Sequence, residues 1–140
     1  MEALVTIPKS LRLEQLRREA ERLLYEKNDV MGAVSIYEKM ILLGDVEAYE
    51  TLGGLFLEGK LIERDIARGY HYYELGAKHH NLASLFYLGI LNAFGDLVPA
   101  NPRRAYRYFY KLCNSADRSY EHAAQNGIMY LKQRYCKTQK

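Results

Sequence analysis

The sequence predicts an all-α fold: a right-handed α-solenoid of antiparallel helical hairpins, with about three repeats and a C-terminal capping helix. Two observations lead to this prediction. Residues of the same chemical type recur at a spacing of 36 positions. Between turn segments that contain Gly, Asp and Asn, apolar residues also follow helical periodicity. With 140 residues, the chain has the length of a single domain.

The repeat is clearest between residues 46–80 and 82–114. Key positions in the first of these units have near-equivalents 36 residues later in the second. The matched pairs are Leu52 with Leu88, Gly53 with Gly89, Gly59 with Gly95, Ile62 with Val98, Asp65 with Asn101, Arg68 with Arg104, Tyr72 with Tyr108 and Tyr73 with Phe109. A weaker unit at 11–44 precedes them. Residues 119–136 form half a unit and are expected to cap the array.

The first unit is expected to pair a helix over 11–28 with a helix over 30–43. Charged side chains surround a helically spaced apolar stripe in the earlier helix, which suits an end cap with a solvated face. Ser10 is expected to be its N-cap. Gly44 is expected to end the second helix.

The next two units follow one plan, with helices expected over 46–58, 66–78, 82–94 and 102–114, and a last helix over about 119–135. Gly59 and Gly95 can adopt positive φ in the turns. Asp65 and Asn101 are expected to cap the helices that follow, and Pro102 occupies the favoured first helical position.

Two glycines fall inside predicted helices. Gly53 costs its helix about 1 kcal/mol relative to alanine. We expect close packing to compensate, with the Tyr73 ring over Gly53 and, in the next unit, the Phe109 ring over Gly89.

The second unit resembles the Sel-one-like repeat, a relative of the tetratricopeptide repeat with a longer turn between its helices. The resemblance rests on Leu52-Gly53, Phe56, Gly59, Ile62, Asp65, Arg68-Gly69, Tyr72-Tyr73 and Gly76-Ala77. It implies the helical-repeat fold, and it implies an adaptor or assembly factor that acts through protein partners in a multisubunit complex.

The segment over 82–94, LASLFYLGILNAF, carries no charge and is apolar nearly all round. A helix of this kind must be buried on several sides. On tetratricopeptide geometry its hairpin position lines the concave surface, where a partner-binding strip is expected at Leu57, Phe86, Ile90, Phe94, Ile128 and Leu131. The alternative is that the curvature of the array buries this strip internally.

Charge is distributed unevenly along the chain. Residues 1–70 carry 10 basic and 13 acidic side chains, whereas residues 71–140 carry 10 basic and 4 acidic ones. Part of the basic excess lies on the outer face of the helix over 102–114, at Arg103, Arg104, Arg107 and Lys111. Because Tyr106 and Tyr110 are interleaved with these cations, an electrostatic contact with RNA is the alternative function.

No pattern in the sequence predicts catalysis, a cofactor or a metal. His79 and His80 are adjacent and point about 100° apart on a helix, so they are poorly placed to share a metal. Cys113 and Cys136 are expected to be free thiols, with a bridge between them as the alternative. No apolar run is long enough to span a membrane. The N-terminus lacks a signal-peptide core and is not acid-free like a transit peptide, so we expect an intracellular protein of the cytoplasm or mitochondrial matrix.

Overall fold

The computed structural model describes residues 7–136, and within that range the chain is all-α. The helices in chain order are α1 (Lys9–Tyr25), α2 (Val30–Leu42), α3 (Glu47–Glu58), α4 (Ile66–Lys78), α5 (Leu82–Phe94), α6 (Pro102–Cys113) and α7 (Glu121–Tyr135). The predicted all-α array of helical hairpins is therefore confirmed.

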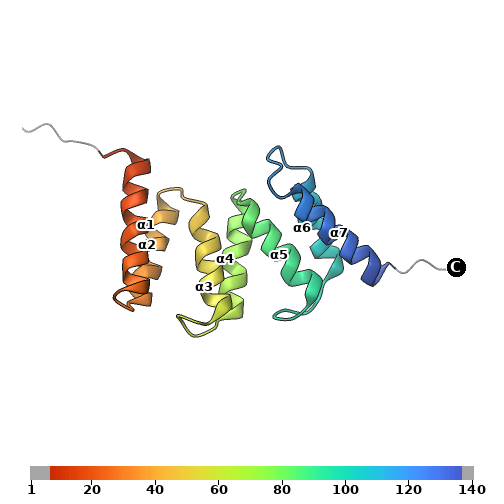
Figure 1. Ribbon diagram of the computed structural model, residues 1–140, viewed down its shortest axis with the longest axis horizontal. Helices are drawn as coiled ribbons and strands as arrows, with labels where there is room; N and C mark the ends of the chain where they lie inside the picture. Colours follow the sequence, from red (N-terminus) through yellow and green to blue (C-terminus); the bar gives the residue numbers. More distant parts are fainter. Residues whose placement is uncertain (1–6, 137–140) are drawn as a thin grey trace, which may run out of the picture.

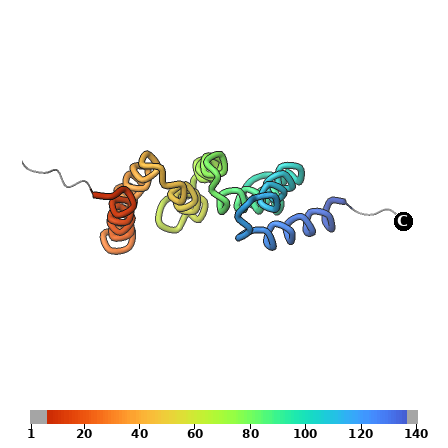
Figure 2. The backbone as a smooth tube through the Cα atoms, turned by 90° about the horizontal axis from the view of Figure 1, so that it is seen from above, coloured from red at the N-terminus to blue at the C-terminus, as the bar shows by residue number. Residues whose placement is uncertain are grey.

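The helices stack side by side in chain order, with α1 at one end of the array and α7 at the other (Figure 1). Seen from above, α2, α4 and α6 lie on one side, and α1, α3 and α7 lie on the opposite side (Figure 2). α5 contacts both α3 and α7. The first helices of successive hairpins therefore share one face of the array.

The core runs from hairpin to hairpin as three connected clusters. Met40 and Leu52 are fully buried where α2 meets α3. Leu57, Tyr73 and Leu88 join the second hairpin to the third. Phe109 is fully buried in the cluster shared by α5, α6 and α7. This continuous chain of contacts is how a helical-repeat array buries faces that a single hairpin would leave open.

The predicted glycine contacts are confirmed. A Cβ atom added to Gly53 would lie 2.8 Å from the Tyr73 ring, and one added to Gly89 would lie 2.5 Å from the Phe109 ring. The same Phe109 ring also meets Gly127 of α7, at 2.6 Å from an added Cβ. Only glycine allows these aromatic rings to approach the neighbouring helix backbones so closely.

The turn predictions are confirmed as well. Gly59 and Gly95 end α3 and α5 with φ values of 66° and 74°, in the left-handed region that favours glycine. Asp65 accepts a hydrogen bond from the Arg68 backbone N–H, and Asn101 accepts one from that of Arg104. These side chains fix where α4 and α6 begin.

Three helix boundaries differ from the sequence prediction by two residues or more. α1 begins at Lys9 with Pro8 as its N-cap, so Ser10 lies inside the helix and does not cap it. α1 also ends at Tyr25, because Asn28 adopts a positive φ of 53° in the turn to α2. α7 begins at Glu121 and not near Ser119, because the Ser119 N–H and hydroxyl both donate to Asp117.

Cys113 is half-buried and Cys136 exposed, and both are free thiols, so the alternative of a bridge is not realised. His79 is the C-cap of α4 and stacks on Tyr49. Among residues 7–136, no set of three or more His, Cys, Asp or Glu side chains is arranged to hold a metal ion. None of the helices in this range has the length and hydropathy needed to cross a bilayer.

Candidate functional site

A groove of about 780 Å³ lies between the first helices of the three hairpins. We call it the α1–α3–α5 groove. Its apolar and aromatic lining comes from α1, α3, the turn after α3, and α5, and includes Tyr25, Gly54, Leu57, Leu61, Tyr87 and Ile90. Tyr25 is 70% exposed and Tyr87 is 43% exposed, so the groove offers aromatic surface to solvent.

Gly54 opens the middle of this groove. A Cβ atom added there would meet nothing closer than the Tyr73 hydroxyl oxygen, at 3.6 Å. Tyr73 comes from α4 and reaches beneath α3, and only 4% of its surface is exposed. The glycine therefore leaves a gap in the wall of α3, and the hydroxyl of a buried tyrosine lies at the bottom of that gap.

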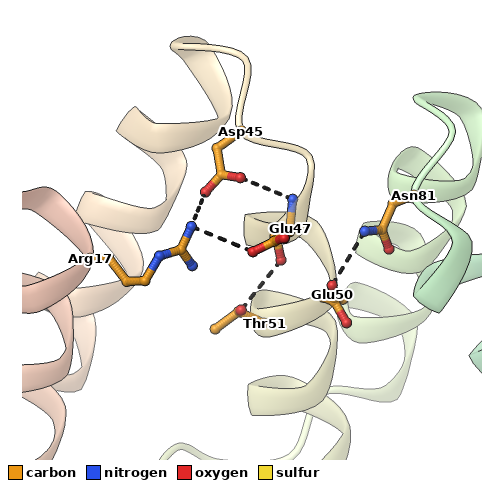
Figure 3. A network of polar contacts seen from close by, with 6 residues as sticks. All are labelled: Arg17, Asp45, Glu47, Glu50, Thr51 and Asn81. Carbon is orange, nitrogen blue, oxygen red and sulfur yellow. Dashed lines mark hydrogen bonds and ion pairs between the residues drawn. The ribbon is translucent and has the colours of Figure 1, made fainter. Parts of the chain in front are cut away.

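A polar network ties α1 to the start of α3 on one side of the groove (Figure 3). Arg17 bonds the Asp45 carboxylate at 2.7 Å and lies 3.7 Å from that of Glu47. Asp45 in turn accepts a hydrogen bond from the Glu47 backbone N–H. The guanidinium is thus already neutralised by carboxylates outside the groove.

Glu50 lies one turn further along α3 and lines the groove. Its carboxylate accepts a hydrogen bond from the Asn81 amide, which is buried at the start of α5. Partial burial raises the pKa of Glu50 above its usual value of 4.5, and the negative charges of Glu47 and Asp45 act in the same direction. The Asn81 hydrogen bond and Arg17 oppose this shift without cancelling it.

The structure separates the six residues of the predicted strip, so the expectation of one open apolar surface is corrected. Leu57 and Leu131 are buried at 7% and 4% exposure. Phe86 is partly buried because α7 packs over it, with the Tyr120 ring 5.5 Å from that of Phe86. Ile128 belongs to α7 and is partly buried against the same core cluster. Phe94 is exposed and packs on Tyr130. Leu57 and Ile90 are the members that line the α1–α3–α5 groove.

The predicted basic face is present on α6. Arg103, Arg104, Arg107 and Lys111 are all exposed, and none forms an ion pair with another residue of the described range 7–136. Tyr106 and Tyr110 stack on the same helix with their ring centroids 5.9 Å apart. Arg104 also lines a second hollow, between α4 and the loop before α6.

Sequence reasoning missed three of the aromatic and apolar groups that line the groove. Tyr25, Leu61 and Tyr87 were not expected there. Repeat alignment shows which positions match, as Leu61 matches Leu97, and it does not show which residues line a groove between hairpins. The available signal was the doublet Gly53-Gly54. The first glycine has a repeat equivalent, whereas the second has Ile90 at its equivalent position and so calls for another explanation.

The sequence contains two Sel1 repeats, at residues 46–81 and 82–117. Together they span just over half of the chain. The chain belongs to the Sel1 repeat family. Sel1 repeats are generally non-catalytic modules of protein–protein interaction, and the family match gives no support to the RNA alternative.

A solved structure agrees with this assignment. The chain is similar to a Sel1 repeat protein from Oxalobacter formigenes, with a TM-score of 0.67 and 20% sequence identity. The match covers 93% of this chain and 50% of that protein, so this chain spans about half the length of the solved relative. At this identity the likeness concerns the fold alone. No curated protein matches the chain.

Proposed function

We propose that this Sel1 repeat chain is a non-catalytic interaction module that binds a segment of a protein partner in the α1–α3–α5 groove. It would act as an adaptor, a scaffold, an assembly factor or a structural subunit of a larger complex. The observation that carries the proposal is the open groove of about 780 Å³, lined by tyrosine and leucine side chains from three successive hairpins.

The dimensions and chemistry of the groove support this proposal. Its volume falls in the range of about 300–1,000 Å³ that is typical of ligand pockets, and it is open along one side, as an extended peptide requires. Exposed tyrosines supply large, rigid contact area and are enriched at protein interfaces. From the strip predicted by the sequence, Leu57 and Ile90 contribute to this surface, and exposed Phe94 offers a second contact at the end of α5.

A second candidate is an electrostatic contact of α6 with an anionic partner. It is favoured by the four exposed cations Arg103, Arg104, Arg107 and Lys111 and by the Tyr106–Tyr110 stack between them. A binding surface of this kind loses affinity steeply with added salt, because phosphates or carboxylates dominate it. The affinity of a partner bound in the α1–α3–α5 groove would fall much less with added salt.

The test of the groove is a substitution that fills it without disturbing the core. Gly54→Leu places a side chain where the nearest atom lies 3.6 Å from the new Cβ, so the variant should fold. The matched control is Ser35→Leu, which adds the same side chain at an exposed position of α2. Co-purification with the cellular partner should be lost in Gly54→Leu and kept in Ser35→Leu. If folded Gly54→Leu protein retains its partner, the groove is not the binding site.

A further inference from the structure

The α1–α3–α5 groove holds carboxylates that form no ion pair with the described residues 7–136. Glu21 of α1 and Glu50 and Glu58 of α3 line it, and within residues 7–136 none of the three takes part in an ion pair. The cations at its margin are Arg17, Lys60 and Arg64. Arg17 is bonded to Asp45, and Arg64 donates to the backbone carbonyl of Glu58.

Two of these carboxylates flank the gap at Gly54. Glu50, Gly54 and Glu58 are spaced four residues apart, so they follow one another along a single face of α3. The two acidic side chains thus lie on either side of Gly54, the position on this face of α3 that has no side chain. A partner group that enters the gap meets a carboxylate in each direction along the helix.

The Tyr73 hydroxyl is a further polar group that the groove offers to a partner. Tyr73 is 96% buried, and its hydroxyl has no hydrogen-bond partner among residues 7–136. In this range every side-chain oxygen and nitrogen that is fully buried does have a partner, so the Tyr73 hydroxyl is not fully buried. The hydroxyl must therefore be reached through the groove, which Tyr73 lines beneath Gly54. Burial raises the pKa of Tyr73 well above its usual range, and the nearby Tyr87, Glu50 and Glu58 act in the same direction. The hydroxyl stays protonated, and its lone pairs can accept a hydrogen bond.

Resting on the function proposed above, we propose that the partner segment inserts an arginine side chain, or less favourably a lysine, into the gap at Gly54. Its charge is balanced by Glu50 and Glu58, one of its N–H groups donates to the Tyr73 hydroxyl, and the Tyr87 ring beside Tyr73 offers an aromatic face to the cation. Arginine fits better than lysine because its five donors can reach several separated acceptors at once.

A selection of random peptides displayed on phage, panned against the whole chain, tests this inference. Peptides that bind the parent and fail on Gly54→Leu should share a basic residue at one position. Replacing that residue by glutamine should weaken binding to the parent by about tenfold or more, as expected for a desolvated charge pair. The same replacement should change binding to the Glu50→Gln/Glu58→Gln variant by less than about threefold, because the two carboxylates that flank the gap at Gly54 are then gone.

The control for this comparison is Glu63→Gln, which removes a carboxylate from the turn outside the groove. In this variant, replacing the basic residue of the peptide should still weaken binding about tenfold. Glu50→Gln keeps an oxygen for the Asn81 hydrogen bond, so the double variant should fold, as a thermal melt would verify. Peptides that need Gly54 but share no basic residue, or whose basic residue is not coupled to Glu50 and Glu58, would overturn the inference and leave the groove function standing. If no selected peptide is sensitive to Gly54→Leu, the groove function itself fails.

Discussion

Gly53 and Gly54 are neighbours in α3 with opposite surroundings. Gly53 faces α4, where an added Cβ would lie 2.8 Å from the Tyr73 ring, and Gly54 faces the groove, where the nearest atom would be the hydroxyl of the same tyrosine at 3.6 Å. One glycine therefore serves helix packing and the other leaves open surface. Their substitution effects should differ in sign.

Replacing Gly53 by leucine should destabilise the protein by roughly 1–3 kcal/mol, because the new side chain overpacks the α3–α4 interface. Replacing Gly54 by alanine should stabilise it by up to about 1 kcal/mol, because alanine is the better helix former and fits without strain. Urea unfolding of both variants beside the parent measures the two effects. Equal destabilisation by both substitutions would show that Gly54 is also a packing position.

The half-buried carboxyl of Glu50 gives stability a pH dependence with a definite sign. Because the pKa of Glu50 is raised above 4.5 in the folded state, the folded protein binds this proton more tightly than the unfolded chain does. The group therefore favours folding in acid, and this contribution is lost as the pH rises through the folded pKa.

Glu50→Gln removes this titration and keeps the acceptor for Asn81. The variant should melt at a higher temperature than the parent at pH 7, and the difference should shrink as the pH falls toward 4.5. Thermal melts of both proteins across this range provide the measurement. A difference that grows in acid would mean that ionised Glu50 stabilises the fold.

At the scale of elements, α7 is held to the array by the Phe109 ring. The ring lies between Gly89 of α5 and Gly127 of α7, at 2.5 Å and 2.6 Å from an added Cβ. A single aromatic side chain of α6 thus packs against both neighbouring helices and sets how closely they approach α6. The docking of α7 in turn covers Phe86 and completes the last core cluster.

Gly127→Leu should therefore release α7 from Phe109, at a cost of roughly 1–3 kcal/mol. Hydrogen exchange followed by mass spectrometry should show faster exchange in α5, α6 and α7, with α1 and α2 unchanged, since those two helices belong to a different core cluster. Unchanged exchange in α7 would contradict the role assigned to Phe109.

The outer face of α6 should tolerate charge reversal. Arg103, Arg104 and Arg107 are exposed and form no ion pair within residues 7–136. Changing all three to glutamate should leave the helical circular dichroism signal intact and lower the melting temperature little, because substitutions at such surface positions have small effects. Loss of the helical signal would show that this face is packed.

Repeat alignment predicted the elements well because it follows positions that every hairpin needs. The glycines under Tyr73 and Phe109, the left-handed Gly59 and Gly95, and the caps at Asp65 and Asn101 all solve local problems that each unit must meet. The bounds of α4 and α5 follow directly from these signals. Where no repeat counterpart exists, as at the two ends, the prediction was weakest.

At the scale of the whole molecule, the sequence predicted only part of the lining of the proposed binding surface. The charge-free helix α5 was expected to line an open strip, but whether Phe86 faces solvent depends on how α7 docks, and that in turn depends on the packing of Gly127 against Phe109. The groove could not be predicted from the sequence for the same reason, because it forms only when α1, α3 and α5 stack beside one another. Tyr25 and Tyr87 lie far apart in the sequence and meet at the groove only through the stacking of hairpins.

Two pairs of exposed tyrosines mark the two candidate surfaces, so one footprinting measurement distinguishes them. Tyr25 and Tyr87 lie in the α1–α3–α5 groove, whereas Tyr106 and Tyr110 lie on the basic face of α6. Hydroxyl-radical oxidation, read by mass spectrometry, would be compared for the free chain and the chain bound to its co-purified partner. We expect the partner to protect Tyr25 and Tyr87 and to leave Tyr106 and Tyr110 as reactive as before. Protection of Tyr106 and Tyr110 with full reactivity at Tyr25 and Tyr87 would contradict the groove as the binding site.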